Sequence, residues 1–459
     1  MRPPLHSALG RALVFGSLSF ARLVGAQSPV ASGASAPAPT VTHDIAPIFQ
    51  QKCQVCHRDG AIAPMSLVTY AEVQKYGKRI RSRVAARRMP PWHLDKTVGI
   101  QSFKNDRSLS DEQIATIVNW IDAGMPEGDP KDLPAPPTWP DPKVWQLADK
   151  FGPPDLIVKS DPYTIAPRGQ DKWWRPLTPT GVTEPRWVRA IEVKPSFPGG
   201  RKVVHHVLAT LVQDEKGVTG LASSAHHASA DGPMSAGLFM EWALGKVGEV
   251  FPSDAGKLML PGSKIRWEIH YYAVGQQVPD DQVELGVWFY PKGVVPKHRT
   301  ILNFFDVAND AELDIAPNQK SVVQNYYVLP APARLENFQP HMHMRGKAMM
   351  MEAVYPDGHR EVLSHVNNFQ WNWHVNYIYA DSVAPVLPKG TTLVFTAWHD
   401  NTRSNPNNPD PDQWVGWGDR TVDEMAHAWV DVTYLEEEEY AQIVAERKKR
   451  SQHANAGVP

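Results

Sequence analysis

The chain has 459 residues, a formal net charge of -2, 42 prolines and 16 tryptophans. This length allows about three domains, each large enough to bury a core. The balanced charge, without a long basic stripe, argues against a nucleic acid as a partner. The many prolines and tryptophans favour a loop-rich, mostly β chain over a helical bundle.

Residues 1–26 have the features of a secretory signal peptide. Arg2 and Arg11 accompany an apolar stretch over 12–20, and small residues end at Ala26, where we expect cleavage. The alternative is a disordered N-terminus. We therefore predict an exported, periplasmic protein, and no later segment is apolar over about 18 residues, so we expect no membrane span in the mature chain.

A Ser-, Ala-, Pro- and Gly-rich stretch over 27–41 is predicted to be a flexible linker. Both cysteines of the chain then fall in one Cys-x-x-Cys-His motif, Cys53, Cys56 and His57. In c-type haem attachment the two thiols bond the vinyl groups and the histidine ligates the iron. The alternative, a redox or zinc-binding cysteine pair, would require further cysteines or a thioredoxin-like βαβ pattern, and the sequence has neither. We therefore predict one covalently bound haem in a small, all-α, cytochrome c-like domain over 42–130.

A methionine downstream of the motif is expected to be the sixth iron ligand. Met89 is the first choice, because the two prolines that follow it hold the chain extended and let the thioether reach across the haem. Met65 is the runner-up, although it lies only eight residues after His57. Met125 is third. It lies at the end of a helix that is expected to begin with a capping box at Ser110, and it could equally be a core residue.

A Pro-rich linker over 131–155 separates this region from the rest of the chain. Short apolar-alternating runs follow, divided by Gly, Pro, Asn and Asp, which is typical of antiparallel sandwiches. About 280 residues of this pattern are too many for one sandwich. We therefore predict two, over 156–300 and 301–436, and a charged helical tail over 437–459.

Three histidines of the first predicted sandwich could form a metal site. His205 and His206 are adjacent, so they face opposite ways in a regular strand, and joint ligation needs a bulge or a strand start. His270 lies on the face of its strand opposite the apolar residues. Neutral imidazoles are good ligands for a transition metal. His226 and His227, in a Ser/Ala/Gly-rich loop, are expected to be solvated.

The second predicted sandwich carries His341 and His343, which share one face of a strand. Further on, Met425 and His427 are expected on the strand face opposite the core residues. A thioether beside imidazoles suits copper, particularly Cu(I), rather than zinc, calcium or magnesium. His427 and His399 are interpreted as supporting or structural residues.

In chain order, the His-His, His, His-x-His and Asp-Glu-Met motifs resemble those of the copper type II, ascorbate-dependent monooxygenases, which include the peptidylglycine α-hydroxylating and dopamine β-hydroxylating enzymes. The resemblance covers residues 156–435 and implies two jelly-roll-like sandwiches with one copper ion each, facing across a cleft. The ligands that it implies are His205, His206 and His270 for the copper that transfers electrons, and His341, His343 and Met425 for the copper that binds dioxygen.

The resemblance also implies a reaction. One O₂, two electrons and two protons would give a hydroxylated small organic substrate and water. We expect the haem to replace or supplement ascorbate, and to receive electrons from an external donor, either ascorbate or a periplasmic redox protein. In the family's animal members an Arg before His-x-His and a Tyr after the Met hold a peptide carboxylate. Gln339 and Trp429 stand at those positions here, so a peptide is not the expected substrate.

Two other functions remain open on the sequence. One is a non-enzymatic periplasmic electron-transfer protein that carries copper and haem. The other is a zinc hydrolase that uses His341, His343 and a carboxylate such as Asp423. The predicted fold class is multidomain, with a small all-α cytochrome c domain followed by two all-β, jelly-roll-like antiparallel sandwiches.

Overall fold

The structure is a computed structural model. The residues that it describes are 38–139, 141, 143–196, 199–215, 237–243, 246, 248–308 and 312–456. The predicted signal peptide, most of the predicted linker, and the predicted solvated pair His226 and His227 lie outside the described residues. Among the described helices, none combines the length and the apolar character needed to cross a lipid bilayer.

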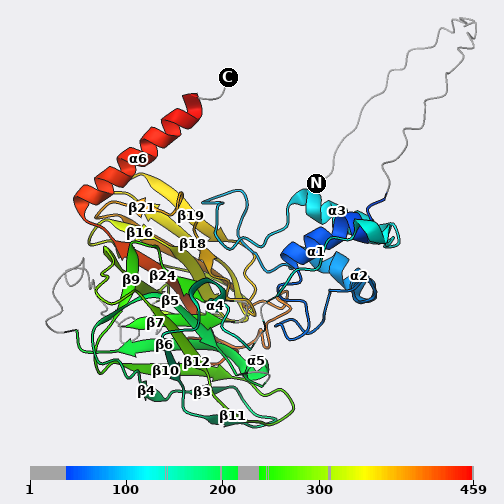
Figure 1. The fold of residues 1–459 in the computed structure, drawn as a ribbon, viewed down its shortest axis with the longest axis horizontal. Coiled ribbons are helices and arrows are strands. Elements are labelled where there is room, and N and C mark those ends of the chain that lie inside the picture. The colour runs from blue at the N-terminus through cyan, green and yellow to red at the C-terminus, as the bar shows by residue number, and fades with distance from the viewer. Residues whose placement is uncertain are drawn as a thin grey trace, which may run out of the picture. The chain divides into compact units, whose positions relative to one another are not determined.

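Three α-helices near the N-terminus pack on one another (Figure 1, blue to cyan). The capping box predicted at Ser110 is confirmed, because its hydroxyl accepts from the Gln113 amide and the Gln113 side chain accepts from the Ser110 amide. A second capping box joins Thr69 and Glu72. The elements of this region are η1 (Val41–Ile45), α1 (Ala46–Lys52), α2 (Tyr70–Ala85), α3 (Asp111–Asp122) and η2 (Pro130–Asp132).

The predicted fold class is wrong, because these helices do not make a separate all-α cytochrome c domain. The described chain is mostly β, and its helices are few and short. Between α2 and α3 the chain runs extended, and it bridges Leu94 to Val366 and Phe103 to Tyr379. Leu94 is buried in the apolar core of the C-terminal strands. An independent cytochrome domain would have to bury these apolar side chains within itself.

An 11-stranded sheet runs through both halves of the β region. In sheet order its strands are β1 (Leu156–Lys159), β12 (Glu284–Phe289), β5 (Arg186–Lys194), β9 (Ala255–Met259), β13 (His298–Asp306), β24 (Ala426–Tyr434), β16 (Ala333–Leu335) and β21 (Val386–Leu387), with β8 (Glu249–Val250), β17 (Asn337–Met342) and β20 (Tyr377–Ile378) beside this path.

The shared sheet is a second departure from the predicted fold class. Parallel pairing of β9 with β13 aligns His298 with Ala255 and Arg299 with Gly256. From Thr300 on, β13 pairs with β24, so this strand crosses the predicted boundary at residue 300 and joins the two stretches in one sheet. The two predicted sandwiches, over 156–300 and 301–436, therefore share one continuous sheet instead of being separate.

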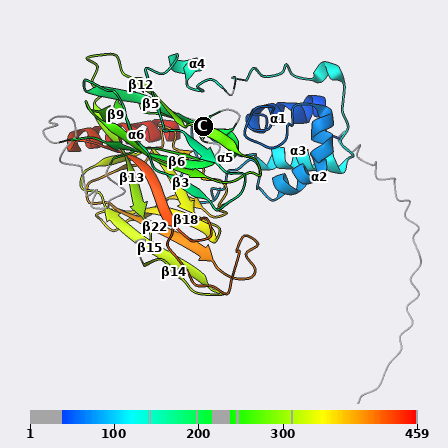
Figure 2. The same cartoon turned by 90° about the horizontal axis from the view of Figure 1, so that it is seen from below.

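Two smaller sheets are formed by the remaining longer strands (Figures 1 and 2). The five-stranded sheet contains β3 (Lys172–Trp174), β10 (Lys264–Tyr271), β6 (Val204–Val212), β7 (Leu238–Ala243) and β4 (Leu177–Pro179). The four-stranded sheet contains β15 (Lys320–Val328), β22 (Thr392–Asp400), β18 (Gly346–Val354) and β19 (Arg360–Val366).

The remaining elements are two strand pairs and three helices. The strand pairs are β2 (Tyr163–Ile165) with β11 (Val278–Asp281), and β14 (Asp314–Ile315) with β23 (Val415–Gly416). The helices are α4 (Ala148–Phe151), α5 (Gly200–Val203) and α6 (Glu437–Ala456), the last of which covers most of the predicted charged tail.

Each smaller sheet shares an apolar core with part of the large sheet. One core joins β5 and β12 to the five-stranded sheet, where Trp267 and Ile269 of β10 are fully buried. This confirms the predicted alternation of β10, with His270 on the other face. The second core joins β24 to the four-stranded sheet through residues such as Val430 and Phe395. The candidate ligands lie on strands that these two cores hold in place, or, for His343 and Met425, directly beside the ends of such strands.

We expect the substitution Leu94→Ala to destabilise the β structure, although Leu94 lies in the predicted cytochrome region. A buried leucine truncated to alanine costs about 3 kcal/mol of unfolding free energy. The control Val98→Ala, at a position 38% exposed in the same segment, should cost under about 0.5 kcal/mol. Denaturant unfolding followed by far-UV circular dichroism gives both values. An unchanged unfolding midpoint of the strands in Leu94→Ala would mean that the segment folds independently of them.

Candidate metal centre

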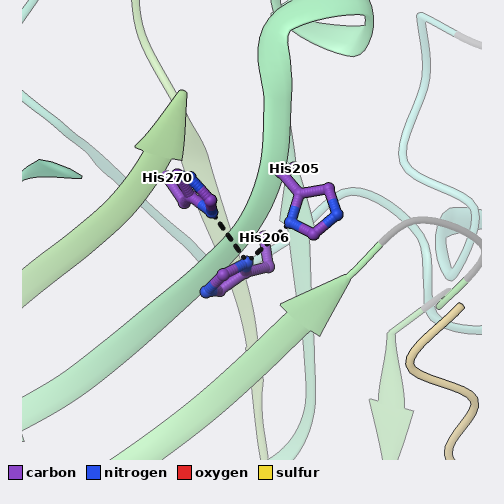
Figure 3. Close-up of side chains that lie close together, drawn as sticks. All are labelled: His205, His206 and His270. Atoms are coloured by element: carbon purple, nitrogen blue, oxygen red, sulfur yellow. Dashed lines mark hydrogen bonds between the residues drawn. The ribbon is translucent and has the colours of Figure 1, made fainter. Parts of the chain in front are cut away.

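The His205, His206 and His270 imidazoles come together through the pairing of β6 with β10. His206 is directly opposite His270, whereas the next pair is Val204 with Tyr271, so the register shifts and His205 occupies a bulge. The prediction that adjacent histidines need a bulge or a strand start is therefore confirmed, because β6 also begins at Val204. Figure 3 shows the three rings turned toward one another.

The nitrogens of this triad are spaced as ligands of one ion would be. The Nδ1 atoms of His205 and His206 lie 3.0 Å apart, and those of His206 and His270 lie 3.4 Å apart. One ligand atom from each ring fits within 4.8 Å of the others. Two nitrogens bound at about 2.0 Å to a tetrahedral ion are about 3.3 Å apart. The triad therefore fits a nitrogen-bound transition metal such as copper.

Burial keeps His205 and His206 in the neutral state that binds metals. It lowers the pKa of His205 to about 4, and it holds the pKa of His206 well below its ordinary value. Imidazoles with such pKa values are neutral at pH 7. Asp171 Oδ2 lies 3.2 Å from His270 Nε2, and this imidazole lowers the pKa of the Asp171 carboxyl. A carboxylate behind a ligating histidine fixes the orientation of its ring.

The second cluster is built where β17 pairs with β24. His341 is opposite His427, and Met342 is opposite Ala426. The pairing ends there; His343 directly follows β17, Met425 directly precedes β24, and both side chains are buried. The rings of His341 and His343 have centroids 5.3 Å apart. Imidazole and thioether donors together are a soft set that suits copper.

His343 has one ring nitrogen engaged and the other available. Its Nδ1 donates to the Asp423 backbone carbonyl over 3.2 Å, so Nε2 carries the lone pair. Burial lowers the pKa of His343 to about 3 and holds that of His341 well below its ordinary value. The Asp423 side chain pairs with Arg420 at 2.6 Å. This carboxylate is therefore neutralised, which does not favour the zinc hydrolase alternative.

Glu424 ties the His-x-His segment to the methionine segment. Its buried carboxylate accepts from the backbone amides of His343, Arg345 at 2.8 Å and Met425 at 3.0 Å. Burial raises the pKa of Glu424 to about 7. Sequence reasoning noted the Asp-Glu-Met motif but gave this glutamate no role. One side chain thus fixes the backbone on both sides of the second cluster.

The two clusters meet, and His374 lies at their junction. The His206 and His341 rings have centroids 5.7 Å apart. The His374 ring is 4.3 Å from that of His341, 5.8 Å from that of His205 and 5.9 Å from that of His206. Sequence reasoning missed His374, because it stands alone in a loop and no motif spacing marks it. The buried imidazoles form one continuous group.

The remaining candidate histidines have other contacts. His399 Nε2 donates to the Met425 carbonyl over 3.2 Å. The His427 ring lies nearly parallel to that of His341, at 16° and 5.9 Å between centroids. A separate cluster of Asp254, His298 and Glu439 could in principle hold a metal. Lysine and arginine side chains already pair with both of its carboxylates, so we interpret it as an ion-pair network.

The Cys-x-x-Cys-His motif opens into a cavity of about 1260 Å³. Pockets of roughly 300–1,000 Å³ hold typical organic ligands, so this one has room for a macrocycle. His57 Nδ1 donates to the Met65 carbonyl over 3.2 Å, which leaves Nε2 free for iron. Burial raises the pKa of Cys53 to about 12, unlike that of a reactive redox thiol. These residues fit a covalently attached haem.

The three methionine candidates for the distal iron ligand differ in position. Met89 and Met65 both line the cavity. The Met65 carbonyl is bonded to His57, so its backbone lies on the proximal side. The Met125 sulfur packs against α2 at Gly77, where it leaves no room for a larger side chain. The geometry favours Met89. The cavity is also lined by His205 and His270.

No protein-family model matches the chain, and no curated protein matches it. The major capsid protein P2 of bacteriophage PM2 is 12% identical and aligns over 61% of this chain and 96% of its own, at a TM-score of 0.24. A broad bean stain virus structure is 9% identical over 68% and 95% of the two chains, also at 0.24. These TM-scores are too low to support an argument about fold or function.

We expect Glu424→Ala to weaken copper binding at the second cluster by 10- to 100-fold, as the loss of an outer partner of a metal site does. The matched control is Asp423→Asn. Asp423 is the neighbour of Glu424 in the sequence, but its carboxylate pairs with Arg420. Competition titration against a Cu(I) chelator measures both affinities, and circular dichroism checks the fold. Equal affinities for the two folded variants would remove the role that we assign to Glu424.

Proposed function

We propose that the protein is a copper-dependent monooxygenase that hydroxylates a C–H bond of a small organic substrate with O₂, and that its electrons arrive through a c-type haem. The observation that carries the proposal is the triad of His205, His206 and His270, whose ligand nitrogens lie within 4.8 Å of one another beside a second group of buried histidines. His205, His206 and His270 would hold one copper ion. His341, His343 and Met425 would hold the other.

Copper bound there would supply the redox chemistry with O₂, and haem on the Cys-x-x-Cys-His motif would supply single electrons. The chain's own residues hold these groups and exclude water. Buried, neutral imidazoles keep their lone pairs free for the ions without a competing proton. Asp171 orients His270, and the Asp423 carbonyl orients His343.

The large cavity supports the haem as the electron source. Cys53, Cys56 and His57 line it together with His205 and His270. Trp371 also lines it, and its ring centroid lies 6.4 Å from that of His205. A haem in this cavity would therefore neighbour the first copper centre. An external donor, ascorbate or a periplasmic redox protein, would reduce the haem of the exported protein.

The surroundings of His341 support a substrate other than a peptide. Gln339, at the position of the family's carboxylate-binding arginine, donates to the His374 carbonyl over 3.2 Å and to the buried Glu241 carboxylate. The ring of Trp429 lies 4.8 Å from that of His341. A buried acid and an indole would disfavour a peptide carboxylate here. The substrate class that fits is a small molecule without a carboxylate.

A non-enzymatic copper and haem electron carrier is the second candidate. It is favoured by the burial of His341, His343 and Met425, which are not among the residues that line the large cavity. A catalytic ion requires a position that substrate and O₂ can reach. Within the described residues, this cavity gives access to the first cluster only.

Oxygen-18 incorporation separates the two candidates. The haem-matured, copper-loaded protein is given ascorbate, oxygen-18 gas and a panel of small compounds with benzylic or amine-adjacent C–H bonds. A monooxygenase transfers one labelled oxygen atom to a product, which mass spectrometry detects. Reduction and reoxidation of the haem and copper without any labelled product across the panel would favour the carrier.

We expect Met425→Leu to lower the Cu(I) affinity of one of two copper sites by at least tenfold, because leucine keeps the volume and removes the sulfur donor. The matched control is Met342→Leu, a fully buried core methionine. Metal analysis of the copper-loaded proteins should give two copper ions per chain for the control and fewer for Met425→Leu. Unchanged copper binding in Met425→Leu would refute the thioether ligand.

We expect Met89→Ala to convert the oxidised haem from low-spin to high-spin, because the iron loses its thioether ligand. Met65→Ala is the matched control, since this methionine lines the same cavity and should leave the spin state unchanged. Optical and electron paramagnetic resonance spectra of the haem-matured proteins report the result. The opposite outcome for the two variants would make Met65 the distal ligand.

A further inference from the structure

One face of helix α2 forms a wall of the cavity into which the Cys-x-x-Cys-His motif opens. Arg79, Ile80, Arg83 and Val84 line the cavity, and their spacing places them along one side of the helix. Ile80 and Val84 are buried, whereas both arginines are exposed. The wall is therefore apolar within the cavity and cationic at its edge.

The two arginines on this wall differ from Arg81 of the same helix. The Arg81 guanidinium donates two hydrogen bonds to the Asp122 carboxylate of α3, at 2.6 and 2.8 Å. The Arg79 and Arg83 side chains have no hydrogen-bond or ion-pair partner within the described part of the chain. Two like charges four residues apart on a helix destabilise it. An anion bound beside them would remove this cost.

The rest of the cavity lining also favours an anion. Its cationic side chains are those of Lys52, Arg79, Arg83, Arg88, Arg107 and Lys347. Among the described residues that line it, Asp171 has the only carboxylate, which lies 3.2 Å from His270 Nε2. A partly enclosed space lined mainly by one sign of charge concentrates the opposite charge. Together with its apolar wall, the cavity suits a ligand that combines an apolar body with carboxylates.

We propose that Arg79 and Arg83 bind the propionate carboxylates of the haem that the Cys-x-x-Cys-His motif attaches. This inference rests on the proposed function, since it takes a haem as resident in the cavity. A haem has an apolar macrocycle with two propionates on one edge, which matches a wall with Ile80 and Val84 inside and guanidinium groups at its edge. A planar guanidinium binds a carboxylate through two parallel hydrogen bonds.

These contacts would set two properties of the haem. Cations beside the propionates stabilise the reduced iron relative to the oxidised iron, which raises the reduction potential. The same cations lower the pKa of the propionates, which therefore stay ionised between pH 5 and 8. Titration of the propionates then makes no contribution to the potential over this range of pH.

The test measures the reduction potential of the haem-matured protein from pH 5 to 8 by optical titration. The Arg79→Gln/Arg83→Gln variant should have a lower potential than the unaltered chain at pH 8, because the propionates lose their counter-charges. Its potential should rise as the pH falls toward 5, because the unpaired propionates take up protons in this range. The Arg79→Lys/Arg83→Lys variant keeps both charges and should restore the pH-independent potential. The control Arg81→Gln, whose arginine pairs with Asp122, should match the unaltered chain.

The outcomes separate the possible sources of the anion. An unchanged potential and pH profile in the Arg79→Gln/Arg83→Gln variant would overturn the inference while the haem remains. Ascorbate, a free anion, is the other source, and slower reduction by ascorbate with an unchanged potential would also overturn the assignment to propionates. If the double variant attaches no haem, the two single variants should each show part of the shift. An unaltered chain that attaches no haem would overturn the proposed electron source itself.

Discussion

The proposed chemistry of this molecule depends on buried imidazoles that face one another. His206, His341 and His374 are almost completely buried, and burial with neighbouring imidazoles holds the pKa of each well below its ordinary value. Their Nδ1 atoms approach those of neighbouring imidazoles to 3.0–3.4 Å, a separation at which one neutral ring can donate to the next or two rings can bind one ion. A bound cation would replace these hydrogen bonds with coordinate bonds. The clustering is the arrangement that the proposed copper sites require.

Backbone pairing over long sequence separations creates the clusters. His206 meets His270 because β6 and β10 pair, and His341 lies beside β24 because β17 pairs with that strand. Glu424 then fixes the ends of the second pairing through three backbone amides. The apolar cores behind these strands set the positions of the ligands, so the stability of the cores and the geometry of the site are linked.

Local patterns predicted much of this arrangement. The bulge at His205 followed from two adjacent histidines, the buried face of β10 from alternation, and the capping box from the residues after Ser110. The fold class failed, because Leu94 packs against β19 and no local pattern encodes a contact between residues so far apart in sequence. His374 was missed for a similar reason, since a lone histidine becomes informative only when the fold brings it to others.

Anomalous diffraction from crystals of the haem-matured, copper-loaded protein tests the central claim most directly. Data collected on either side of the copper absorption edge should show two copper peaks. One should lie among His205, His206 and His270, and the other among His341, His343 and Met425. Peaks confined to exposed histidines, or none at the two clusters, would contradict a buried copper centre in this fold.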